Sequence, residues 1–165
     1  MFVLGVDPGL TRCGYGAVRQ EAGRLRAEAA GVLTTSPAEG LPQRLAELQR
    51  TVRALLAELA PDAVAVERVF FQSNVRTAMS VGQASGVVLA EAVAAGCSVV
   101  EYTPTQVKAA VTGSGSADKT QVQRMVRSLL GLVELPRPAD AADALALAIC
   151  HLAAAPLQAR VREAG

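Results

Sequence analysis

Hydrophobic and polar positions along the chain predict five β-strands. The first three are short runs separated only by the turn segments PGLT and QEAGR, which predicts an antiparallel meander. The fourth, AVAV, is continuously apolar, as expected for a central strand covered on both faces. The predicted strands are residues 2–6, 13–20, 25–35, 63–66 and 97–102.

Apolar residues at helical spacing predict the remaining elements. The clearest helix is 41–60, in which seven Leu or Val residues recur at helical intervals and Pro42 falls in the first turn. In a second helix, 75–95, Gly82 and Gly86 lie four residues apart, which indicates close packing against another helix. The other predicted helices are 103–112, 118–130 and a segment that opens at residue 140.

The order of these elements is typical of an α/β fold. Three antiparallel strands followed by two parallel strands give a five-stranded mixed sheet, which the helices flank. The length of 165 residues and the hydrophobic content of 51% predict a single globular domain over residues 1–165. Roughly the last ten residues are expected to form a loosely ordered tail.

Composition narrows the classes of protein that fit. No run approaches the roughly 18 apolar residues of a membrane span, and the N-terminus lacks a basic segment and a cleavage site, so we expect a cytoplasmic protein. Cys13, Cys97 and Cys150 are too few and too dispersed for a disulfide framework or a zinc site. The net charge is only +1, but residues 68–137 carry seven basic against four acidic side chains. Charge therefore permits a nucleic-acid partner without requiring one.

The segment 140–152, DAADALALAICHL, is apolar on nearly every face yet retains two aspartates, Asp140 and Asp143. Residues three apart on a helix lie side by side, and two unpaired charges there repel by roughly 3 kcal/mol at an effective dielectric of about 20. We therefore expect a positive group nearby. Helix capping is the alternative, because prolines precede Asp140 and the helix dipole favours acids in the first turn. The single histidine, His151, is expected to cap the other end of the helix.

Two more carboxylates end the most buried of the predicted strands. Asp7 follows the first strand and Glu67 follows the fourth, and sites in α/β sheets gather beyond such strand ends. If the two strands are neighbours, these residues lie roughly 5 Å apart. With Asp140 and Asp143 they would form a cluster of four carboxylates, the ligands that Mg²⁺ or Mn²⁺ prefers. The alternative is that Asp7 is an ordinary turn residue and Glu67 a solvated strand end.

Five segments of the chain resemble the RuvC family of bacterial Holliday-junction resolvases, a branch of the RNase H-like superfamily. The resemblance is collinear over nearly the full length. The segments are GVDPGLTRCGYG (5–16), AVERVFFQSN (65–74), GQASGVVL (82–89), VKAAVTGSGSADKTQVQRMVRSLLGL (107–132) and ADAADALALAICH (139–151).

The resemblance implies an RNase H-like fold and a homodimer that cuts two symmetric strands of a four-way DNA junction. It implies two Mg²⁺ ions per subunit, for which Mn²⁺ can substitute, and cooperation with the RuvA–RuvB branch-migration complex. The four acidic residues that fall on family catalytic positions are Asp7, Glu67, Asp140 and Asp143.

The resemblance also implies residues that bind DNA. Lys108 and Lys119 match family lysines near the scissile phosphate, where a point charge binds the backbone; a solvated helix face is the alternative for each. Phe70 matches a family aromatic that stacks on or wedges between junction bases, with core burial as its alternative. Arg76 is expected to contact a phosphate.

Three other functions fit parts of the sequence. The segment DPGLTRCG resembles the phosphate loop of actin-like ATPases, although those enzymes need two lobes and this chain holds one. A related RNase H-fold nuclease could act on RNA or on ordinary DNA. A catalytically silent module that only binds junctions is the third alternative, which the complete set of four carboxylates disfavours.

Overall fold

The computed structural model describes the backbone of residues 1–68 and 75–163, and the side chains of residues 1–68 and 77–155. Within these ranges the chain forms a five-stranded sheet and five helices. The elements in chain order are β1 (Phe2–Asp7), β2 (Arg12–Glu21), β3 (Arg24–Thr34), α1 (Leu41–Leu59), β4 (Ala63–Glu67), α2 (Val75–Ala94), β5 (Ser98–Tyr102), α3 (Pro104–Thr112), α4 (Lys119–Leu129) and α5 (Ala139–Glu163).

The strand order in the sheet is β3-β2-β1-β4-β5. Strands β1, β2 and β3 pair antiparallel, whereas β1 with β4 and β4 with β5 pair parallel. The predicted mixed sheet is therefore confirmed. The first hairpin turns through Ala22 and Gly23, which both have positive φ (48° and 76°). This backbone matches the primed two-residue turns that suit the twist of a hairpin.

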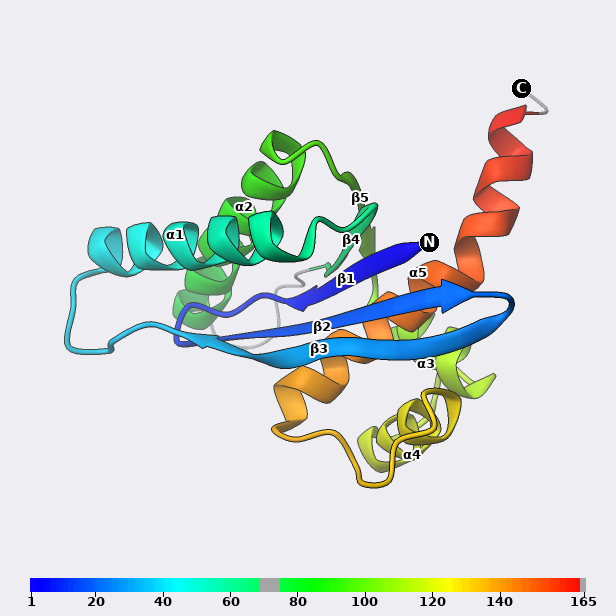
Figure 1. The fold of residues 1–165 in the computed structure, drawn as a ribbon. Coiled ribbons are helices and arrows are strands. Elements are labelled where there is room, and N and C mark those ends of the chain that lie inside the picture. The colour runs from blue at the N-terminus through cyan, green and yellow to red at the C-terminus, as the bar shows by residue number, and fades with distance from the viewer. Residues whose placement is uncertain (69–74, 164–165) are drawn as a thin grey trace.

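The helices form two layers, one on each face of the sheet (Figure 1). Alternate residues of the strands point to opposite faces. On one face, Leu4, Val6 and Val64 pack against α1 and α2. On the other, Val3 and Ala65 join the buried residues of α3, α4 and α5. Asp7 lies four residues beyond Val3 and Glu67 two residues beyond Ala65, so both acids face the layer that contains α5.

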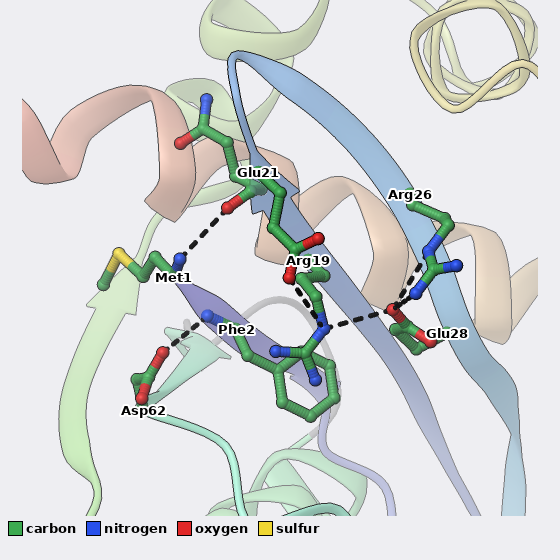
Figure 2. Close-up of polar contacts among 8 residues, drawn as sticks. Met1, Phe2, Arg19, Glu21, Arg26, Glu28 and Asp62 are labelled. Carbon is green, nitrogen blue, oxygen red and sulfur yellow. Dashed lines mark hydrogen bonds and ion pairs between the residues drawn. The ribbon is translucent and has the colours of Figure 1, made fainter.

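The start of β1 is fixed by local polar contacts (Figure 2). The Phe2 amide donates a 2.6 Å hydrogen bond to Asp62, and the Arg19 guanidinium lies 4.1 Å from the centre of the Phe2 ring. These contacts hold the N-terminal end of β1, opposite to the end that carries Asp7.

Among the described residues, no helix is long and apolar enough to cross a membrane.

Two expectations about helices need correction. A Cβ atom added at Gly82 or Gly86 would meet no atom of the described residues within 4 Å, so these glycines do not serve close packing within that part of the chain. Helix α5 extends to Glu163. His151 consequently lies inside the helix instead of capping it. It is buried, with its Nδ1 2.9 Å from the Tyr102 hydroxyl, and burial lowers its pKa.

Candidate active site

Three glycines allow α5 to lie directly on the sheet. Gly5 and Gly16 are cross-strand partners on β1 and β2. A Cβ at Gly5 would overlap the carbonyl of Ala144, and one at Gly16 would lie 2.7 Å from the backbone nitrogen of Leu145. Gly14 lies in the same way beneath the backbone of Asp140. The absence of side chains at these positions brings the first turns of α5 against the ends of the strands.

Asp7 and Glu67 are neighbours at the same edge of the sheet. Val6 pairs in register with Val66, so the two acids that follow end adjacent parallel strands. Strands in a sheet are about 4.8 Å apart, and the two carboxyl groups hydrogen-bond each other. Gly14 is the antiparallel partner of Asp7 and also contacts Asp140. The strand register thus brings Asp7, Glu67 and Asp140 to one place.

The two aspartates of α5 each bind a cationic side chain. Arg12 donates to Oδ2 of Asp140 from Nη2 at 2.8 Å and from Nε at 3.1 Å. Lys119 Nζ lies 2.7 Å from Oδ2 of Asp143. The positive groups expected beside this apolar helix are therefore present. Asp140 does lie in the first turn of α5, as the capping interpretation requires, but its carboxylate binds Arg12.

Several carboxylates lie close together at this site and shift one another's pKa values. Burial raises the pKa of Asp7 to about 7, with further increases from Glu67, Asp143 and Asp140, and Lys119 opposes them. Burial and Asp143 also raise the pKa of Glu67. The hydrogen bond to Asp143 raises the pKa of Lys119. The other three predicted carboxylates thus all act on Asp7, the acid that lies within reach of every other member of the cluster.

A hollow of about 250 Å³ opens beside these residues. Its polar lining includes Glu67, Asp143, Lys108 and Lys119, and its apolar wall includes Val107 from α3. Both predicted lysines therefore lie at the carboxylate cluster instead of on a remote helix face. Phe70 and the side chain of Arg76 lie outside the residues that the structure describes.

Arg12 is the residue at this site that the sequence patterns did not single out. It stands two positions before Gly14 on β2, so both residues face α5. The two-residue spacing from Gly14 would have indicated Arg12 as a site residue only if Gly14 had been known to lie under α5. As the side chains stand, no three His, Cys, Asp or Glu groups in the described part of the chain are arranged to hold a metal ion. Asp140 and Asp143 are directed to their cations instead.

Comparison with known proteins identifies the family. The model of the family "Crossover junction endodeoxyribonuclease RuvC" matches residues 3–151. This chain belongs to the RuvC family. It is 60% identical over 153 residues to the RuvC of Salinispora arenicola, covering 92% of this chain and 87% of that protein. The RuvC of Syntrophomonas wolfei is 55% identical over 152 residues, covering 92% and 88%.

Solved structures of RuvC proteins have the same fold. The structure described as Thermus thermophilus RuvC in complex with Holliday junction substrate superposes with a TM-score of 0.90 at 43% identity, covering 96% of each chain. The yeast mitochondrial resolvase Ydc2 gives a TM-score of 0.67 at 14% identity over 98% of this chain and 83% of that one, a likeness of fold alone. The predicted RuvC resemblance and RNase H-like sheet are confirmed.

Proposed function

We propose that this RuvC protein is a structure-specific endonuclease that resolves four-way DNA junctions in homologous recombination and repair, by nicking two symmetric strands. The observation that carries the proposal is the meeting of Asp7, Glu67, Asp140 and Asp143 beyond the ends of β1 and β4. A junction is the substrate we favour over RNA or linear duplex, because that is the substrate named for the T. thermophilus relative.

The donor set fits divalent metal ions. Carboxylate oxygens are the preferred ligands of Mg²⁺ and Mn²⁺. The pKa of Asp7 stays raised because Lys119 offsets the neighbouring negative charges only in part. Arg12 and Lys119 already neutralise one aspartate each, which marks the cluster as a site that attracts positive charge. We assign Asp7, the most central acid, to both of two ions, with the other three carboxylates completing the set. Such ions supply an activated water and stabilise the departing 3′ oxygen.

Two lysines and two residues that follow β4 in sequence would contact the DNA. Lys108 and Lys119 line the hollow beside Glu67 and Asp143, where an ammonium group can bind the scissile phosphate and offset charge that develops on it. We assign Phe70 to the junction bases and Arg76 to a phosphate on the strength of the family resemblance. Cleavage would leave a 5′ phosphate and a 3′ hydroxyl, ends that a ligase seals.

Symmetric cleavage requires two copies of the chain, and α2 offers a surface for pairing. Four of its residues follow one another at spacings of three, four and seven, on one face of the helix: Met79, Gly82, Gly86 and Val93. Met79 and Val93 are 58% and 65% exposed, and space beside both glycines is open. Small residues let two helices approach closely. We assign this face to the partner copy in a homodimer.

Gly86→Arg tests that assignment. A Cβ at Gly86 would meet no described atom within 4 Å, so the fold should persist while the dimer dissociates. Light scattering after size-exclusion chromatography measures the mass, with Gly40→Arg as a control at the start of α1. A dimer that withstands Gly86→Arg would reject this face as the interface. The RuvA–RuvB complex and a cytoplasmic location are proposed from the family alone.

The decisive test of the function is cleavage of a fixed four-way junction with Mg²⁺ or Mn²⁺, beside linear duplex and an RNA–DNA hybrid. The wild-type protein should produce paired nicks in the junction only. Asp7→Asn should still bind the junction but cut nothing, whereas Glu58→Gln, at an exposed acid near the far end of α1, should cut normally. Undiminished cutting by Asp7→Asn, or equal cutting of linear duplex, would contradict the proposal.

A further inference from the structure

Arg12 is built into the site by the same glycine that admits α5. It begins β2 and points to the face that Gly14 leaves open, where Asp140 lies directly overhead. Both Nη2 and Nε of Arg12 donate to a single carboxylate oxygen, Oδ2 of Asp140. The guanidinium therefore occupies one of the two carboxylate oxygens with which Asp140 could bind another cation.

We propose that Arg12 is a tethered counter-ion that competes with the catalytic metal for Asp140, an inference that rests on the proposed metal-dependent function. A guanidinium stays charged at any working pH, so it cannot yield the oxygen by losing a proton. A divalent ion bound at Oδ2 would repel the neighbouring guanidinium. Metal binding through Oδ2 of Asp140 therefore requires Arg12 to move away.

The exposure of the pair permits that movement. The side chain of Arg12 is 49% exposed and that of Asp140 is 33% exposed, so neither is locked in the core. Ion pairs at such exposure are weak, and their loss changes an equilibrium constant by at most about fivefold. The contact is thus strong enough to hold Asp140 when no metal is bound and weak enough for a divalent ion to displace it.

Lys119 does not make Arg12 redundant. Lys119 starts α4 and binds Asp143, whereas Arg12 approaches from β2 and binds Asp140. The two cations therefore hold different acids from different elements of the fold. When Arg12 leaves Asp140 it stays tethered beside the site, where a guanidinium is well suited to bind a DNA phosphate.

Calorimetric titration with Mn²⁺ tests the proposal without measuring cleavage. Arg12→Gln should bind Mn²⁺ about three- to fivefold more tightly than the wild-type protein, and Arg12→Lys, which keeps the charge, should bind nearly as the wild type does. Arg26→Gln is the matched control, because Arg26 also binds one oxygen, Oε1 of Glu28, through Nε and Nη2 (Figure 2). It lies near the opposite end of the β2–β3 hairpin and should leave Mn²⁺ affinity unchanged.

A second measurement separates competition from a positioning role. Without metal, Arg12→Gln should melt at a lower temperature than the wild type, and saturating Mn²⁺ should abolish the difference. Equal or weaker Mn²⁺ binding by Arg12→Gln, alongside normal binding by the wild type, would overturn the inference and leave the proposed function intact. Absence of Mn²⁺ binding by the wild-type protein would overturn both.

Discussion

Replacing Gly16 by alanine tests whether the glycines of the sheet set the position of the aspartates on α5. The added Cβ would lie 2.7 Å from the backbone nitrogen and from Cγ of Leu145. Ordinary contact begins at 3.4 Å, so the helix must retreat locally by about 0.7 Å. Leu145 is two residues beyond Asp143, so the displacement reaches the carboxylates directly.

Both activity and stability should suffer from this substitution. A shift of about 1 Å at a catalytic group can reduce a rate about a hundredfold, so we expect Gly16→Ala to lower the rate of junction cleavage by roughly ten- to a hundredfold. Overpacking of a tight contact costs about 1–3 kcal/mol of unfolding free energy. Junction binding should change much less, because the DNA surface extends beyond the displaced helix.

Single-turnover cleavage of a fixed junction, binding measured in Ca²⁺ and urea denaturation together resolve these effects. Gly40→Ala is the matched control: its φ of −69° suits alanine, and its Cβ would meet the side-chain amide of Gln43, which can move, and Cδ of Pro42 at an ordinary contact distance of 3.9 Å. Cleavage by Gly16→Ala within twofold of the wild-type rate would show that the close approach at β2 does not position the acids.

Three further predictions concern charge, packing and DNA. Folding raises the pKa of Asp7 from 3.8 to about 7, so deprotonation at higher pH destabilises the metal-free fold. In urea denaturation with EDTA, the stability advantage of Asp7→Asn over the wild type should therefore grow by about 2–3 kcal/mol between pH 5 and pH 8. Arg53→Ala removes two hydrogen bonds to Glu91, which Gln49 still binds, and should lower the urea midpoint in the same assay without slowing cleavage. Phe70→Ala should slow cleavage of a fixed junction more than it weakens binding, as measured by fluorescence anisotropy; unchanged turnover would reject its assignment.

The parts of the fold that could be predicted are those in which local pattern and burial agree. The run AVAV before Glu67 is buried on both faces because β4 lies centrally in the sheet, so its sequence alone marks a covered strand. The acids were recognisable because Asp7 and Glu67 stand where apolar strands stop. Asp140 and Asp143 stood out because they interrupt a helix that is otherwise apolar.

The features that escaped prediction depend on partners distant in sequence. Arg12 binds Asp140 across 128 positions, and no spacing along the chain records that contact. Within the described part of the chain, Gly5 and Gly16 admit a neighbouring helix, α5, whereas Gly82 and Gly86 have open space beside them. His151 was expected to cap a helix end, whereas α5 continues beyond it and the histidine packs against Tyr102. In each case tertiary contact, not local propensity, decides the role.

The balance of charge at the site leads to one more consequence for metal binding. Among the described side chains, two cations form ion pairs with these four acids: Arg12 with Asp140, and Lys119 with Asp143. Asp7 and Glu67 remain side by side, and because the pKa of Asp7 is raised to about 7, Asp7 is partly protonated near neutral pH. A divalent ion can bind Asp7 fully only when that proton leaves, so metal affinity should rise with pH between about 6 and 8. The same ion must also draw Asp140 from Arg12, so metal uptake at this site is coupled both to proton release and to movement of a guanidinium.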